Sequence, residues 1–175
     1  MKKKYFFLIF IFISFANYSF SQDVNILDGD TIKINGETIR FSGIDTPETT
    51  YYRKYKQICY LDNQKIYCGE ISKNKLIEKI GSNKINCIRE EKKDVYGRTL
   101  AECFVNDESL SSYLVKNGYA FDFKKYSKKK YDLDQAYAKE NKLGLWAMKF
   151  LYPWDWRSKI RKYRKDKTTL KEIEK

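Results

Sequence analysis

The sequence predicts one mixed α+β domain that is mainly β, and three observations support this fold class. Short apolar runs separated by turn residues occupy the first half of the chain, which is typical of an antiparallel sheet. Apolar residues at helical spacing follow in the second half. The length of 175 residues suits a single domain, and 42% hydrophobic and 17% aromatic residues exclude a disordered chain.

Three strands are expected first, at residues 24–27, 31–34 and 38–44. The dipeptide Asn35-Gly36 separates the second from the third and is typical of a type I′ hairpin turn, because both residues tolerate positive φ angles. Side chains alternate along a strand, so Arg40 projects from the face opposite Phe41. Pro47 ends the third strand, since proline cannot donate a hydrogen bond to a sheet.

The rest of the chain predicts two more strands and three helices. The strands are expected at 84–90 and 98–105, and the helices at 69–80, 109–117 and 127–143. Residues 49–68 are rich in Tyr and Lys and are expected to form a loop. Five short antiparallel strands with a helix between the third and the fourth indicate a five-stranded Greek-key barrel of the OB type, with three helices.

The two ends of the chain differ from the domain between them. Residues 1–21 contain a Lys cluster, an unbroken run from Tyr5 to Ile13 and then small and polar residues, which is the order of a secretory signal. A membrane anchor is the alternative, but it needs about 20 apolar residues. We therefore expect a signal peptide at 1–21, a domain at 22–156 and export to the periplasm or the medium, without membrane insertion after cleavage. Residues 157–175 are expected to be a basic tail.

The four cysteines are consistent with export, because disulfides persist in oxidising compartments. Cys87 and Cys103 lie symmetrically about Val95, so a hairpin that turns there would place them opposite each other, with Cα atoms about 4.5 Å apart. This arrangement predicts the pairs Cys87–Cys103 and Cys59–Cys68. The alternative is four free thiols in a cytosolic protein.

The charged residues exclude several classes of enzyme. The chain has 35 Lys and Arg against 23 Asp and Glu, a formal net charge of +12, and it has no histidine. Without histidine it cannot use a Ser-His-Asp or Cys-His arrangement, or a zinc site of the HExxH type. Catalysis would have to use carboxylates, Arg, Lys or Tyr, or a metal ion held by oxygen ligands.

Three short motifs carry the residue types that such catalysis needs: DGDT at 28–31, IDTPET at 44–49 and DVYGR at 94–98. Each motif alone is also consistent with an ordinary turn or strand end. Together they supply Asp30, Asp45 and the backbone carbonyl of Thr46, which are hard oxygen ligands of the kind that Ca²⁺ prefers. Glu48 is close to these ligands in the sequence and could take a proton from water.

Two arginines complete this set of residues. Arg40 and Arg98 belong to different predicted hairpins, and a guanidinium group matches phosphate oxygens in a bidentate manner. A metal ion polarises a phosphoryl oxygen, a carboxylate activates water, and the arginines stabilise the charge that develops on the phosphate. The three motifs therefore indicate hydrolysis of a phosphodiester.

Three motifs occur in this order over residues 24–146: DGDT, R-x₄-DTPET and DxYGR. With these motifs the chain resembles the staphylococcal nuclease (thermonuclease) family, in particular its cysteine-containing exported bacterial members. The resemblance implies an OB-fold barrel with three helices and a Ca²⁺-dependent nuclease that cleaves DNA and RNA and leaves 3′-phosphate ends. We expect a monomer. Val95 stands where the best-known member has a Lys that contacts phosphate, so nucleotide affinity is expected to differ.

The resemblance also implies a role for each residue of the motifs. The calcium ligands would be Asp30, Asp45 and the Thr46 carbonyl, and the catalytic residues would be Arg40, Arg98 and the general base Glu48. Tyr96 and Tyr126 are candidate contacts to a base or sugar. The three tryptophans at 146, 154 and 156 are expected to cover the core and anchor the last helix, with base stacking as the alternative.

Two other functions are consistent with parts of the sequence. One is an OB-fold module that binds nucleic acid without catalysis, but such a copy should lack at least one of the five charged residues at 30, 40, 45, 48 and 98, and all five are present. The other is a basic surface protein that binds acidic envelope polymers through residues 157–175. Binding of that kind would not depend on calcium.

Overall fold

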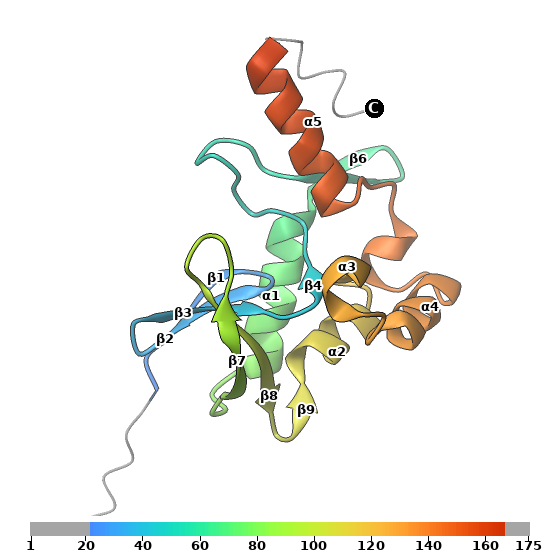
Figure 1. The fold of residues 1–175 in the computed structure, drawn as a ribbon. Coiled ribbons are helices and arrows are strands. Elements are labelled where there is room, and N and C mark those ends of the chain that lie inside the picture. The colour runs from blue at the N-terminus through green and yellow to red at the C-terminus, as the bar shows by residue number, and fades with distance from the viewer. Residues whose placement is uncertain (1–21, 167–175) are drawn as a thin grey trace, which may run out of the picture.

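The computed structural model describes residues 22–166, and its first three strands form an antiparallel meander (Figure 1). They are β1 (Val24–Asp28), β2 (Thr31–Ile34) and β3 (Glu37–Phe41). Asn35 and Gly36 connect β2 to β3 with φ angles of 49° and 88°, as the predicted type I′ turn requires. Arg40 is partly exposed while Phe41 is buried, so the two side chains lie on opposite faces as expected.

A second hairpin, β7 (Asn86–Lys93) with β8 (Thr99–Val105), joins the meander and gives the order β1-β2-β3-β8-β7. The short strand β9 (Glu108–Ser109) pairs with β8. β3 and β8 run parallel, which corrects the expectation that all five strands pair antiparallel. The mixed α+β class is confirmed. Within residues 22–166 no ladder joins β7 to β1, so the path of paired strands is open.

The predicted helices are present, with one exception. The helices expected at 69–80 and 109–117 are α1 (Cys68–Ile80) and α2 (Leu110–Lys116). The exception concerns the extent of the helix expected at 127–143: it is the shorter α4 (Asp132–Glu140), and a separate turn of helix, α3 (Lys124–Ser127), precedes it. Lys128 and Lys129, with φ angles of 54° and 67°, break the helix between them, because left-handed residues cannot continue a right-handed helix.

Two further helical segments follow, so the described chain has more helices than the three expected. They are the 3₁₀ helix η1 (Gly144–Ala147) and α5 (Pro153–Asp166). α5 begins with a proline. Proline is favourable at the first helical position, because an N–H group there would have no acceptor within the helix and its loss costs nothing. This helix runs across residue 156, where the sequence analysis placed the end of the domain, and it projects at the top of the molecule in Figure 1.

The loop expected at 49–68 contains a hairpin instead, formed by β5 (Ile58–Leu61) and β6 (Gln64–Tyr67). Asp62 and Asn63 form its turn with φ angles of 47° and 68°. The turn lacks the glycine that usually marks a two-residue hairpin, which explains why the sequence did not reveal it. Two more short strands, β4 (Ile44–Asp45) and β10 (Phe121–Asp122), pair with each other beside the main sheet.

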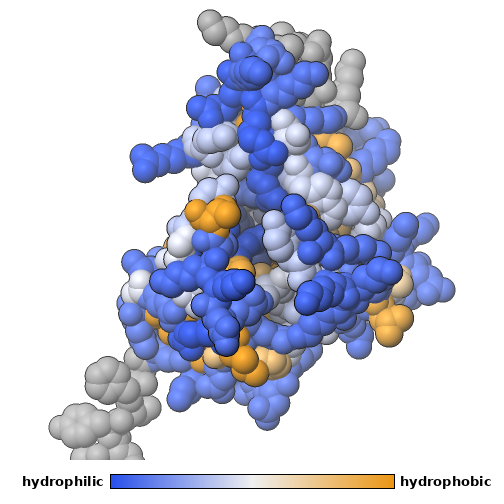
Figure 2. All heavy atoms as spheres, in the orientation of Figure 1, coloured by the Kyte–Doolittle hydropathy of each residue, from blue (hydrophilic) through white to orange (hydrophobic). Residues whose placement is uncertain are grey.

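The main core lies between the sheet and helices α1 and α2, and it consists of aliphatic side chains with Phe41. Burying a side chain of this size stabilises the fold by about 1.5–3 kcal/mol. An aromatic cluster surrounds the fully buried Phe121 and includes Trp146 and Trp154, so these tryptophans cover the core as expected. Most of the face shown in Figure 2 is hydrophilic.

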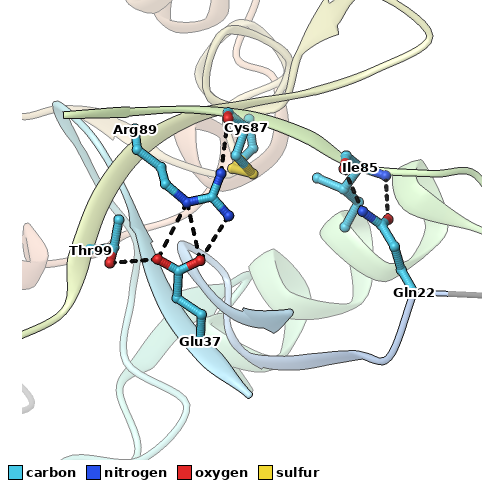
Figure 3. The surroundings of a disulfide bond; sticks show 7 residues. Gln22, Glu37, Ile85, Cys87, Arg89 and Thr99 are labelled. Carbon is cyan, nitrogen blue, oxygen red and sulfur yellow. Dashed lines mark hydrogen bonds and ion pairs between the residues drawn. A yellow bond between two sulfur atoms is a disulfide. The ribbon is translucent and has the colours of Figure 1, made fainter. Parts of the chain in front are cut away.

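Both predicted disulfides are present. Cys87 and Cys103 are direct partners in the β7–β8 register, with Cα atoms 4.0 Å apart, and Cys59–Cys68 closes the β5–β6 hairpin. Figure 3 shows the surroundings of the first pair, where Glu37 accepts hydrogen bonds from Thr99 and from the Arg89 side chain on β7. These contacts link β3, β7 and β8 at the edge of the sheet.

The expected signal peptide at 1–21 lies outside the described residues, as does the end of the basic tail after residue 166. Between residues 22 and 166, no helix is both long and apolar enough to cross a membrane.

The double variant Cys87→Ala/Cys103→Ala should lose about 3 kcal/mol of unfolding free energy, because the disulfide closes a loop with a sequence separation of 16. Urea unfolding followed by tryptophan fluorescence measures this loss. The double variant Cys59→Ala/Cys68→Ala, whose loop is shorter with a separation of 9, should lose slightly less. A loss below ~1 kcal/mol for the first variant would contradict the prediction.

Candidate active site

Arg40 on β3 lies between two buried carboxylates. Its Nη2 atom donates to Asp45 Oδ1 at 2.8 Å and to the Ile44 carbonyl oxygen at 3.2 Å. Its Nη1 atom forms an ion pair with Asp30. Both carboxylates are almost completely buried. Burial acts to lower the pKa of Arg40, but the negative charges of Asp30 and Asp45 raise it above its ordinary value. The β1–β2 turn, β3 and β4 therefore meet at the Arg40 side chain.

The Asp30 carboxylate also ties the DGDT motif to the segment after β4. Its Oδ2 atom accepts a hydrogen bond from the backbone N–H of Thr46 at 2.9 Å, and its Oδ1 atom accepts one from the Thr31 hydroxyl at 3.0 Å. Burial acts to raise the pKa of Asp30, but Arg40 and these hydrogen bonds lower it below the ordinary value. Asp30 is therefore charged in the folded protein at neutral pH.

Glu48 is held by a residue that the sequence analysis did not single out. Arg157 on α5 donates from Nη1 to Glu48 Oε1 at 2.6 Å and to Asp45 Oδ1 at 3.1 Å, and from Nη2 to Asp45 Oδ2 at 2.6 Å. Burial raises the pKa of Glu48 even though Arg157 acts to lower it. In the sequence Arg157 is one of many basic residues near the C-terminus, and only the fold distinguishes it.

Asp28 is a fourth carboxylate beside this network. Its pKa is raised to about 8, because burial disfavours its charged form and because the negative charges of Asp30 and Glu48 act on it. Three ionised carboxylates, Asp30, Asp45 and Glu48, face the two guanidinium groups of Arg40 and Arg157, which leaves a net charge of −1, and ionisation of Asp28 would add a further negative charge. A divalent cation would neutralise this excess.

The donor atoms suit a hard cation. Within residues 22–166, Asp30 Oδ2 and Asp45 Oδ2 each accept one hydrogen bond, although a carboxylate oxygen can accept two. The Thr46 hydroxyl is buried with no partner in the same part of the chain. No group of three or more His, Cys, Asp or Glu suited to a metal is present among the described residues. A cation here would therefore bind two carboxylates and uncharged oxygen atoms, as Ca²⁺ and Mg²⁺ do.

Arg98 approaches the carboxylates from the β7–β8 turn. Its Nε atom donates to Asp94 Oδ2 at 2.6 Å, and Asp94 Oδ1 accepts the backbone N–H groups of Tyr96 and Arg98, which fixes the turn. Burial acts to raise the pKa of Asp94, but these hydrogen bonds lower it below the ordinary value. Arg98 lines one pocket of about 430 Å³ together with Asp28, Thr31 and Thr49, so it shares a pocket with neighbours of Asp30 and Glu48 without joining the ion-pair network.

The two candidate tyrosines lie apart from this network. Tyr96 is 81% exposed in the β7–β8 turn, with its ring centroid 5.3 Å from the Arg98 guanidinium. Tyr126 on α3 is 62% exposed, and its ring packs against Phe123 at 4.9 Å. The structure therefore brings together Asp30, Arg40, Asp45, Thr46 and Glu48, whereas Arg98 lines the adjacent pocket that contains Asp28.

Comparisons with known proteins show which family this chain resembles. Residues 38–148 match the model of the family described as staphylococcal nuclease homologues. The chain is 32% identical to the endonuclease YncB of Bacillus subtilis (strain 168), over 69% of this chain and 58% of that protein. It is 30% identical to the succinoglycan biosynthesis protein ExoI of Rhizobium meliloti (strain 1021), over 70% and 62% respectively.

A plant protein extends the range of organisms. The probable staphylococcal-like nuclease CAN3 of Oryza sativa subsp. japonica is 32% identical over 73% of this chain and 30% of its own length. The chain thus spans less than two thirds of the length of each of these three proteins.

Gly69, in the first turn of α1, supports the position of Glu48. A Cβ atom at residue 69 would overlap the Glu48 carbonyl group and the Thr49 nitrogen. Gly69→Ala should therefore push the Glu48 backbone away and lower the unfolding free energy by about 1–3 kcal/mol. Urea unfolding measures this effect. Glu78→Ala, at an exposed position of the same helix, is the control and should change stability by less than ~0.5 kcal/mol.

Proposed function

The chain belongs to the family of staphylococcal nuclease homologues, and on this premise we propose that it is an exported, Ca²⁺-dependent nuclease of DNA and RNA. Family membership and the relatives named as nucleases support nuclease activity in general. Calcium dependence, both substrates and 3′-phosphate products are the finer parts of the proposal. The observation that carries it is the junction of Asp30, Arg40, Asp45 and Glu48 in one buried network.

The two aspartates suit a calcium site, because each keeps one carboxylate oxygen with room for a further contact. Bound calcium would polarise a phosphoryl oxygen of the substrate. Arg40 is held in a single orientation by Asp30, Asp45 and the Ile44 carbonyl, and this leaves N–H donors of its guanidinium for a phosphate. Such a preorganised donor stabilises charge without reorganisation during the reaction.

Glu48 has the properties of a general base. Arg157 binds its Oε1 atom, which leaves Oε2 to accept a proton from water. A pKa raised by burial makes the carboxylate a stronger base than it would be in solvent. Arg98 lines the pocket that contains Asp28 and supplies the second guanidinium for charge that develops on the phosphate.

Export is supported by the residue order of the N-terminal 21 residues and by the two disulfides, since such bonds are rare in reducing compartments. The alternative of a binding module without catalysis has no support from a missing residue, because the charged residues of all three motifs are present.

Digestion of plasmid DNA and of RNA tests the proposed activity. The mature protein should cleave both in Ca²⁺, and excess chelator should abolish cleavage. End labelling should detect phosphate on the 3′ ends. Binding to nucleic acid without cleavage in Ca²⁺ would support the non-catalytic module instead.

Arg98→Ala provides a sharper test than Arg40→Ala, because loss of Arg40 would also leave the buried Asp30 carboxylate without its ion-pair partner. Arg98→Ala should lower kcat/KM by about 10²–10³-fold, since it removes one preorganised charge from the transition state. Arg89→Ala is a matched control, because Arg89 lies on the same hairpin and pairs with the exposed Glu37. Equal losses of rate in the two variants would exclude a specific role for Arg98.

A further inference from the structure

Arg157 is the largest difference between the site that the sequence predicts and the site that the structure contains. It lies outside the family-matched range of 38–148, yet its side chain is only 19% exposed and binds both oxygen atoms of Asp45. The same guanidinium also binds Glu48. The expected basic tail therefore begins with a residue that reaches into the site.

The helix that carries Arg157 is docked by contacts on its other residues. Trp156 and Ile160 are buried in a cluster with Tyr51, Tyr55 and Tyr163. Figure 1 shows α5 above the segment that follows β4, which includes this tyrosine-rich stretch. α5 therefore has docking contacts in addition to the ion pairs of Arg157.

Gln57 links the same parts of the chain a second time. Its buried side chain accepts a hydrogen bond from the Glu48 backbone N–H at 3.2 Å and donates one to the Leu151 carbonyl oxygen at 2.8 Å. Leu151 lies just before α5. The neutral amide of Gln57 thus connects the Glu48 backbone to the segment before α5. The contacts of the Arg157 guanidinium are made with the side-chain carboxylates instead.

We propose that Arg157 is a positioning residue of the active site, an inference that rests on the proposed nuclease function. Its planar fork holds the carboxylates of Asp45 and Glu48 in a fixed relation, 112 and 109 residues away in the chain. Removing it would leave the carboxylates of Asp30, Asp45 and Glu48 with the single guanidinium of Arg40, a net charge of −2 in the ion-pair network. Mutual repulsion would then turn Glu48 away from the position in which it faces a substrate.

This role predicts opposite effects on turnover and on cation binding. Arg157 occupies Asp45 and adds positive charge, so it opposes a cation at the same carboxylates. Its removal should therefore strengthen cation binding while slowing the reaction. A residue that merely stabilised the fold would weaken both.

The experiment compares wild type, Arg157→Ala, Arg157→Lys and Arg161→Ala in the full mature chain. Arg161 is the control, because it lies one turn further along α5 and bonds the Tyr51 hydroxyl at 3.2 Å instead of a carboxylate. The measurements are kcat and KM on a single-stranded oligonucleotide, the Kd of Ca²⁺ by titration calorimetry, and the Tm in chelator and in Ca²⁺.

Arg157→Ala should lower kcat about 100-fold with KM within about threefold of wild type, which is the loss expected when a reacting group is misplaced by about 1 Å. Its Kd for Ca²⁺ should fall at least ~3-fold, and Ca²⁺ should raise its Tm more than it raises that of wild type. Arg157→Lys should recover part of kcat, because a single ammonium keeps the charge but not the fork. Arg161→Ala should match wild type.

Several results would overturn the inference. An unchanged kcat in Arg157→Ala would do so, as would a weaker Ca²⁺ affinity. A large rise in KM at constant kcat would make Arg157 a substrate-binding residue instead. An equal loss of kcat in Arg161→Ala would assign the effect to docking of α5. If Arg157→Ala does not fold, a wild-type kcat and a wild-type Kd for Ca²⁺ in Arg157→Lys would overturn the inference. A wild type that cleaves nothing would overturn the proposed function itself.

Discussion

The buried carboxylate of Asp45 is the constraint on which the rest of the site depends. An ionised group taken out of water costs several kcal/mol unless it is paired and hydrogen-bonded. Asp45 is completely buried, and it is paired with both Arg40 and Arg157. The fold must therefore bring β3 and α5 next to β4. Asp30 shares Arg40 and so draws the β1–β2 turn into the same arrangement.

A network of this kind fixes the orientation of its side chains more than it stabilises the fold. Buried ion pairs often contribute little net free energy, because desolvation offsets most of their attraction. Their value here is that each partner has one orientation, and a site that acts on phosphate needs donors and acceptors in fixed positions. The excess of negative charge that remains is compatible with a divalent cation. The same carboxylates would then serve the fold and the chemistry together.

Local signals in the sequence were sufficient where the structure depends on neighbouring residues. Asn35-Gly36 predicted its turn, and the symmetric spacing of Cys87 and Cys103 predicted their pairing. The first two motifs predicted which carboxylates the structure brings together near Arg40, whereas Arg98 of the third motif pairs with Asp94. Arg157 could not be found in this way, because its partners are more than a hundred residues away and its neighbours are equally basic. The sequence also contains no sign of the break at Lys128, because lysine normally favours a helix.

The position of α5 at the end of the described chain has a consequence for the timing of assembly. Chains fold from the N-terminus during synthesis, and contacts between distant residues form after local ones. The contact between Arg157 and Asp45 spans 112 residues, so it can close only after residue 157 has been made. If Arg157 positions Glu48 as proposed, a chain that stops before residue 157 carries all three motifs but lacks a working site.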